Sequence, residues 1–165
     1  MIGAVVLAAG AASRYGSPKQ RLFLPRVLEA LRATAVEEVV VVAGAHQIEA
    51  NVRVVYSAEW ERGPGASLRS GLAGLQPGVE AAVVVLADGP DLDPRAVDRV
   101  IEVWRAGGGD LLAATYDGVN RSHPVLIGLM AWDRIPDAGA RHLATVLVPC
   151  RDLRPPGDVD VPPAR

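Results

Sequence analysis

The feature that most constrains the fold is an apolar run at residues 2–7 that breaks into a loop of small residues. A continuous apolar run of this length is typical of a strand buried on both faces of a sheet. In the loop, Gly10 and Gly16 permit positive φ angles and a close approach of backbone to a ligand, so that several N–H groups can face one anion. Arg14 and Lys19 add two positive charges. The loop is therefore predicted to hold phosphate groups.

Two familiar phosphate-binding motifs do not fit this loop. A P-loop has four residues between its glycines and a Lys directly after the second, whereas five residues separate Gly10 from Gly16 and Lys19 comes three places later. The dinucleotide fingerprint needs a second glycine at the position of Ala12. An ordinary strand-to-helix turn with solvated basic side chains is the structural alternative.

Apolar runs and helical patterns alternate along the rest of the chain. Strands are expected over residues 39–43, 52–56, 81–87, 111–116 and 124–127, and helices over 26–35, 65–75, 94–104 and 139–147, the last leading into 146–153. This alternation predicts a three-layer, Rossmann-like α/β fold, with a mainly parallel sheet and helices on both faces. The length is that of a single domain, residues 1–165. Ligands of such sheets gather beyond the C-terminal ends of the strands.

A second candidate functional loop begins at Asp88, directly after the apolar run at 82–87. Mg²⁺ that arrives with a nucleotide usually takes one or two protein carboxylates, while phosphates and waters fill its other positions. Asp88 is therefore a candidate metal ligand. The alternative is a plain turn, because Asp, Gly and Pro are the residues that turns prefer.

Composition narrows the classes of partner. The formal net charge of −2 gives no electrostatic reason to expect a nucleic-acid partner. The N-terminal apolar run is too short to span a bilayer and leads into no cleavage region, so a cytoplasmic protein without a membrane partner is expected. The single cysteine, Cys150, cannot form an internal disulfide.

The N-terminal stretch resembles the signature of the MobA-like nucleotidyltransferases, in which LAAG is followed after three residues by R-x-G-x-x-K. It is most similar to the molybdenum cofactor cytidylyltransferase branch. The resemblance implies a loop that wraps the triphosphate of a nucleotide, with Arg14 and Lys19 as catalytic residues that stabilise the departing pyrophosphate. The nucleotide-binding positions that it implies in this loop are Leu7, Ala8, Ala9, Gly10 and Gly16.

Three further segments extend the resemblance towards the nucleotide and the metal. Residues 60–72 are similar to the family's W-x-x-G-x-x-x-S-L-x-x-G-L, which implies base contacts from Gly65, Ser67 and Leu68. Residues 87–90 match A-D-Q-P except at the third position, which implies that Asp88 holds the catalytic Mg²⁺. Near the C-terminus, Asp160 matches the inner Asp of a D-I-D-T-P-E-D-like segment and is implied as a second Mg²⁺ ligand.

Two other segments point to the acceptor. His123 lies in a segment similar to G-H-P-V-L-F, and Asp137 in one similar to G-D-x-G-A-R, so both are implied to bind the acceptor substrate. The chain departs from the family after Lys19, where a K-L-L-x-x-x-x-G-x-P-L-L segment is usual and Val27 already follows within eight residues.

The resemblance implies an Mg²⁺-dependent nucleotidyltransferase that moves CMP from CTP to a phosphate-bearing acceptor, molybdopterin cofactor, and releases pyrophosphate. Ala9 favours CTP, because the guanylyl-transferring branch more often has Gly at that position. The alternatives are a guanylyltransferase, a sugar-phosphate nucleotidyltransferase of the same fold, and a non-catalytic nucleotide-binding protein. The sequence leaves the oligomeric state open.

Overall fold

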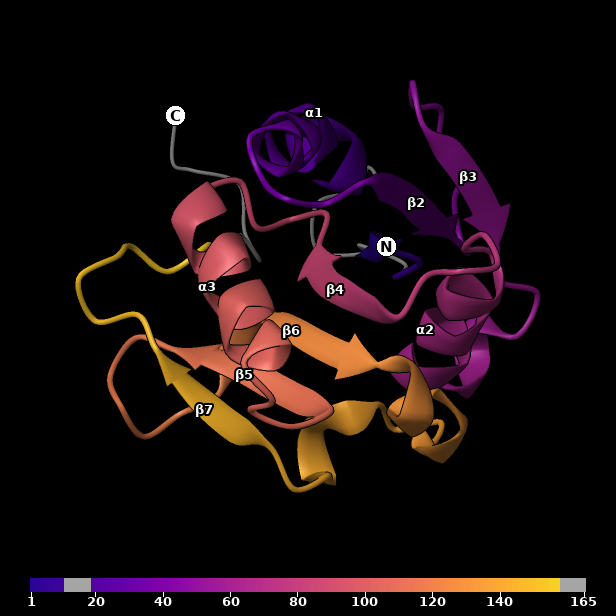
Figure 1. Ribbon diagram of the computed structural model, residues 1–165. Coiled ribbons are helices and arrows are strands. Elements are labelled where there is room, and N and C mark those ends of the chain that lie inside the picture. Colours follow the sequence, from indigo (N-terminus) through magenta and orange to yellow (C-terminus); the bar gives the residue numbers. More distant parts are fainter. Residues whose placement is uncertain (11–18, 158–165) are drawn as a thin grey trace.

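A seven-stranded sheet, in the order β3-β2-β1-β4-β6-β5-β7, forms the centre of the computed structural model (Figure 1). The structure describes residues 1–10 and 19–157, of which positions 19 and 20 are described by their backbone. The strands are β1 (Ile2–Ala8), β2 (Glu38–Ala43), β3 (Arg53–Tyr56), β4 (Ala81–Leu86), β5 (Leu111–Thr115), β6 (Ser122–Gly128) and β7 (Val146–Pro149). The α-helices are α1 (Lys19–Arg32), α2 (Pro64–Ala73) and α3 (Pro94–Arg105), and 3₁₀ turns occur at η2 (Trp60–Arg62), η3 (Leu129–Arg134) and η4 (Ala140–His142).

The expected mainly parallel, three-layer architecture is confirmed. Strand β1 runs parallel to β2 and β4, β2 to β3, and β5 to β7, whereas β6 is antiparallel to both β4 and β5. Helices α1 and α3 cover one face of the sheet and α2 covers the other (Figure 1). Six strands therefore run in the same direction, and β6 runs in the opposite direction.

Alternate residues of the central strands feed two separate cores. Val6 packs with Leu31 and Ile101 under α1 and α3, whereas its neighbour Val5 packs with Leu72 under α2. All of these side chains are buried. Since successive residues of a strand face opposite sides, a strand covered on both faces must be apolar at nearly every position. This explains the unbroken apolar runs in the sequence.

Helix α2 lies very close to its neighbours, and two glycines permit this. A Cβ at Gly71 would lie 2.5 Å from a methyl carbon of Val5, on the sheet. A Cβ at Gly65 would overlap the carbonyl oxygen of Pro136, in the loop that follows η3. The N–H of Gly65 donates to the carbonyl of Asp137 at 2.8 Å. The start of α2 and the loop at 135–139 therefore form one packed unit.

The first helix is longer than the predicted helix over 26–35. It begins at Lys19 and passes through Pro25, which cannot donate the usual backbone hydrogen bond. Pro25 is exposed, whereas Leu24 is buried, so the apolar stripe continues one turn before Leu28. Burial of that extra turn outweighs the missing hydrogen bond, and the boundary predicted at the proline was wrong.

The predicted last helix over 139–147 was also wrong. Only η4 is helical there, and the chain then enters β7, whose Val146 pairs with Leu112 of β5. The segment at 146–148 reads Val-Leu-Val, and Val148 is buried. Residues 146–149 form a strand because they pair with the edge of β5. The sequence of this segment alone does not show that such an edge is available.

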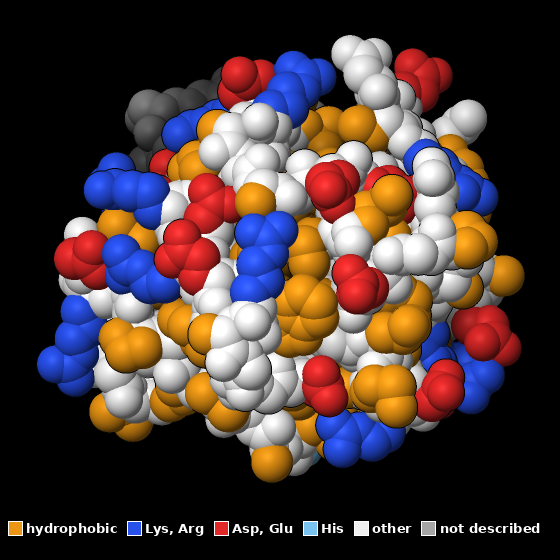
Figure 2. Space-filling model, viewed as in Figure 1, with side chains coloured by type: hydrophobic (Ala, Val, Ile, Leu, Met, Phe, Trp, Pro, Cys, Tyr) orange, Lys and Arg blue, Asp and Glu red, His pale blue; other side chains and the backbone are white. Residues whose placement is uncertain are grey.

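The described surface carries mixed charge. Figure 2 shows Lys and Arg side chains interspersed with Asp and Glu side chains on the face that it presents. Within residues 1–10 and 19–157, no helix has both the length and the apolar character needed to cross a membrane.

We predict that Gly65→Ala lowers the free energy of unfolding by about 1–3 kcal/mol, because its Cβ must displace the backbone at Pro136. Chemical denaturation monitored by circular dichroism measures this. The control is Pro64→Ala, the neighbouring exposed position, for which a change below about 1 kcal/mol is expected. Equal stability of Gly65→Ala and the wild type would contradict the packing described for α2.

Candidate active site

The two candidate functional loops leave neighbouring strands at the same edge of the sheet. Leu7 of β1 and Leu86 of β4 are the last paired residues of these parallel strands. One residue further, the N–H of Ala87 donates to the carbonyl of Leu7 at 3.0 Å. The loop that follows Ala8 and the loop that holds Asp88 therefore start side by side, beyond the carboxyl ends of both strands.

The structure describes only part of the first loop. Leu7 is partly buried, Ala8 and Ala9 are buried, and Gly10 is exposed. The predicted residues that lie outside the described part are Arg14, Gly16 and Asp160, together with the side chain of Lys19.

Asp88 is half-buried directly beyond the end of β4. Within the described residues, no cluster of three or more His, Cys, Asp and Glu side chains gathers that could hold a metal ion by itself. One carboxylate ligand at a strand end fits a metal that is held largely by phosphate oxygens and water, as Mg²⁺ is in nucleotide complexes. The donor at this edge is thus compatible with Mg²⁺ carried by a nucleotide.

The C-terminal segment returns to the Asp88 loop. The N–H of Asp91 donates to the carbonyl of Pro156 at 2.9 Å. A Cβ at Gly89 would lie 3.2 Å from the carbonyl oxygen of Gly157, so a larger residue at this position would meet the returning chain. The glycine that replaces the family's glutamine therefore leaves room for this segment. Asp160 follows three residues after Gly157, in the part of the chain that the structure does not describe.

A cavity of about 640 Å³ opens on the α2 side of this edge and is called the central cavity below. Strands β1, β4 and β6, the start of α2 and residues 138–141 surround it. Its apolar wall includes Leu7, Leu68, Val84, Leu86, Val125 and Ile127, and its polar side chains are Arg121, Ser122, His123 and Arg141. It thus brings predicted nucleotide residues, Leu7 and Leu68, and a predicted acceptor residue, His123, to one space.

His123 reaches this edge because β6 is antiparallel to β4. Val84 pairs with Val125, so Leu86, two residues after Val84, and His123, two residues before Val125, lie towards the same edge of the sheet. Both residues line the central cavity and also a smaller cavity of about 200 Å³ on the α1 and α3 side, which residues 155–157 help to enclose. His123 therefore stands at the junction of the two cavities, on the same edge as Asp88.

The surroundings of His123 keep its imidazole neutral at pH 7. Burial and the nearby Arg121 guanidinium lower the pKa of His123 to about 4, against a smaller opposing effect of the Asp88 carboxylate. The backbone carbonyl of His123 accepts a hydrogen bond from the Tyr116 hydroxyl at 2.8 Å. A neutral imidazole can donate or accept a hydrogen bond but supplies no positive charge.

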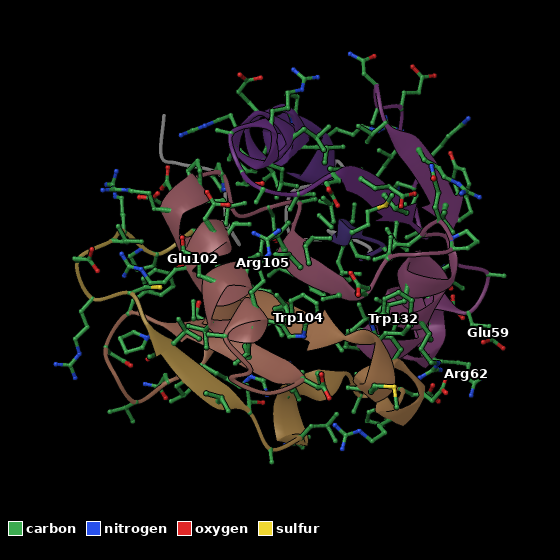
Figure 3. The ribbon with its side chains drawn as sticks, viewed as in Figure 1. Glu59, Arg62, Glu102, Trp104, Arg105 and Trp132 are labelled. Carbon is green, nitrogen blue, oxygen red and sulfur yellow. The ribbon has the colours of Figure 1, made fainter. Side chains whose placement is uncertain are left out.

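Asp137, the other predicted acceptor residue, is bound to two arginines. One carboxylate oxygen accepts from Arg62 Nη2 at 3.0 Å, and the other accepts from Arg69 Nη2. These bonds, first that from Arg69 and then that from Arg62, hold the pKa of Asp137 below its usual range. Arg62 also pairs with Glu59 at 2.9 Å, and Figure 3 shows the two side chains together near α2. The structure gives Asp137 a positioning role between α2 and its own loop, and its contact with an acceptor stays a prediction.

The predicted base-contacting residues lie in the first turns of α2. The N–H of Gly65 is already bonded to Asp137, so this group is not available to a nucleobase. Ser67 is buried, and its hydroxyl has no hydrogen-bond partner among the described residues. Leu68 lines the central cavity. Ser67 and Leu68 are thus better placed for a base contact than Gly65.

Sequence reasoning assigned no function to two arginines that line the central cavity, Arg121 and Arg141. Arg121 directly precedes the segment that was singled out for His123, and Arg141 is the last residue of the segment that was singled out for Asp137. Their convergence depends on η4 packing near the start of β6, which no local pattern in the sequence predicts.

Comparison with known proteins adds the family and the fold. The family described as MobA-like NTP transferase domain matches residues 4–149. The solved structure of Rv0371c from Mycobacterium tuberculosis H37Rv is similar, with 26% identity, a TM-score of 0.76 and coverage of 97% of this chain and 92% of that chain. A manganese complex of Rv0371c gives 22% identity, a TM-score of 0.70 and coverage of 90% and 88%. No curated protein sequence matches the chain.

A third solved structure is titled molybdopterin-guanine dinucleotide biosynthesis protein A, from Archaeoglobus fulgidus. It shares 18% identity with this chain and has a TM-score of 0.63, with coverage of 90% of this chain and 83% of that one. At this identity the likeness concerns the fold.

We predict that stability falls between pH 7 and pH 5 because of His123. With a folded pKa of about 4 and an unfolded pKa near 6.5, only the unfolded chain gains this proton in that range, so lower pH favours unfolding. The loss at pH 5 should be roughly 1–2 kcal/mol, measured by urea unfolding at both pH values. His123→Asn removes this titrating group, so the difference in unfolding free energy between pH 7 and pH 5 should be smaller in that variant. An unchanged pH dependence in that variant would contradict the environment described for His123.

Proposed function

The chain belongs to the MobA-like NTP transferase family, and on this premise we propose that it transfers CMP from CTP to molybdopterin cofactor and releases pyrophosphate. The observation that carries the proposal is the pairing of β1 with β4, because it starts the glycine loop and the Asp88 loop side by side. One loop is suited to phosphates and the other to a metal that accompanies them. A nucleotidyl transfer needs both beside the same α-phosphate.

In the proposed reaction, an oxygen of the acceptor phosphate attacks the α-phosphorus of CTP. A bond forms between them while the bond to the bridging oxygen of the β-phosphate breaks, and pyrophosphate leaves with that electron pair. Backbone N–H groups of the loop after Ala8, with Arg14 and Lys19, would bind and stabilise the departing pyrophosphate. Asp88 and Asp160 would hold Mg²⁺, which supplies positive charge beside the α-phosphate.

The acceptor phosphate is already an anion at neutral pH, so it needs no strong base to activate it. This agrees with the low pKa of His123, whose neutral imidazole could orient an acceptor by hydrogen bonding. Catalysis would therefore rest mainly on positioning and on charge, as in other phosphoryl transfers.

The choice of CTP over GTP rests on Ala9, and GTP is the second candidate because one similar structure carries a molybdopterin-guanine title.

A third candidate, nucleotide binding without transfer, is favoured by the short connection after the glycine loop. Helix α1 begins at Lys19 itself, so the family's usual intervening segment has no counterpart between the loop and the helix. A cavity of about 860 Å³ remains between α1 and residues 47–51.

The proposal is tested by incubating each of the four NTPs with Mg²⁺ and molybdopterin cofactor and measuring pyrophosphate release and product mass. We expect turnover with CTP. Turnover with GTP alone would identify a guanylyltransferase, and tight nucleotide binding without product would identify a non-catalytic protein.

We predict that Asp88→Asn lowers kcat at least 100-fold while the unfolding midpoint changes little, because a charged metal ligand at a half-buried strand end is lost. Asp133→Asn is the matched control, since Asp133 is exposed on η3, away from this edge of the sheet. Normal turnover in Asp88→Asn would rule out its role as a metal ligand.

A further inference from the structure

Two arginines converge on the central cavity without a carboxylate between them. Arg121 is half-buried at the residue before β6, and Arg141 is exposed in η4. Neither takes part in a salt bridge within the described residues. Burial and the positive charge of Arg141 lower the pKa of Arg121. The two positive charges therefore repel each other. Such a pair is stabilised when an anion binds between its members.

The backbone holds the Arg121 guanidinium in place. Its Nη1 donates to the carbonyl of Ala140 at 2.8 Å and to the hydroxyl of Thr145 at 3.0 Å. These neutral acceptors leave its charge uncompensated, and its Nε and Nη2 have no partner among the described residues. Arg121 thus presents an oriented fork of donors.

The arginines beside α2 make an informative contrast. Arg62 and Arg69 both bind Asp137, so their charges are compensated within the protein. Asp137 lies only four residues before Arg141, yet its carboxylate is bound to the other pair and does not line the central cavity. No Asp or Glu of the described chain lines this cavity. Within the described residues, no carboxylate is therefore placed to compensate Arg121 and Arg141, and an anionic ligand can take that position.

The position of the pair separates it from the predicted nucleotide phosphates. Strand β4 stands between β1 and β6 in the sheet. With strands about 4.8 Å apart, the start of β6, which follows Arg121, lies about 10 Å across the sheet from the start of the glycine loop. The apolar side chains of Val125 and Ile127 lie in the same cavity and suit the body of an organic molecule.

We propose that Arg121 and Arg141 bind the phosphate of the acceptor substrate, so that this substrate is a phosphate monoester with an apolar or ring-shaped body. The inference rests on the proposed function for its acceptor, but the phosphate site can be tested without turnover. A planar guanidinium can bind two phosphate oxygens at once, and a third oxygen then remains to face the α-phosphate.

Phenyl phosphate is the probe for this site, and phenol is its uncharged counterpart. We expect calorimetric titration to give weaker binding of phenyl phosphate by about tenfold or more in Arg141→Gln and in Arg121→Gln, with phenol binding unchanged. Arg141 makes no hydrogen bond within the described residues, so Arg141→Gln removes the charge without disturbing the fold. The matched control is Arg134→Gln, which removes one charge from an exposed position on η3.

Wild-type affinity for phenyl phosphate in Arg141→Gln, or an equal loss in Arg134→Gln, would overturn the proposal. The affinity for CTP with Mg²⁺, measured on the same variants, should not change. A parallel loss of CTP affinity would overturn the assignment to the acceptor, because the arginines would then hold the nucleotide. Arginine-dependent binding of phenyl phosphate in a protein that binds no NTP would support the phosphate site and contradict the proposed transfer.

In the transfer assay, Arg141→Gln should raise KM for molybdopterin cofactor at least tenfold while KM for CTP stays the same. Loss of kcat with both KM values unchanged would overturn the proposal, since a residue that binds the acceptor ground state must affect its KM.

Discussion

The candidate site depends on one structural constraint, the parallel pairing of β1 with β4. Each strand is buried on both faces, and register places Leu7 opposite Leu86 at the same edge. A shift of one residue would turn the side chains of one strand towards the wrong core, so this register is strongly fixed. The positions at which the two loops leave the sheet are therefore set by packing of the whole domain, whatever sequences the loops carry.

Features that depend on local chemistry could be predicted from the sequence. Continuous apolar runs identified β1, β2 and β4, and the helix predicted over 94–104 starts at the same residue as α3, Pro94. The predicted helix over 139–147 failed because pairing with the edge of β5 overrides local preference. The start of α1 failed because burial of Leu24 compensates for a proline inside the helix. Both errors reflect tertiary contacts that a helical pattern does not encode.

The site itself was only partly predictable. Asp88 and the glycine loop each follow a strand and could be identified one at a time, and the mainly parallel sheet suggested their common edge. The approach of His123 requires β6 to run antiparallel to β4, and the contact of Gly89 with the C-terminal segment requires that segment to return. The sequence also did not predict the difference between the two arginine pairs. Asp137 compensates Arg62 and Arg69, whereas Arg121 and Arg141 share a cavity without a carboxylate.

The central claim is that the ends of β1 and β4 together form a nucleotide and metal site. A crystal structure with CTP and Mn²⁺, with anomalous scattering used to locate the metal, tests it most directly. The account predicts an anomalous peak at the Asp88 carboxylate, with the nucleotide phosphates between Asp88 and the loop after Ala8. A nucleotide bound elsewhere, for example between α1 and residues 47–51, or a metal without contact to Asp88, would contradict it.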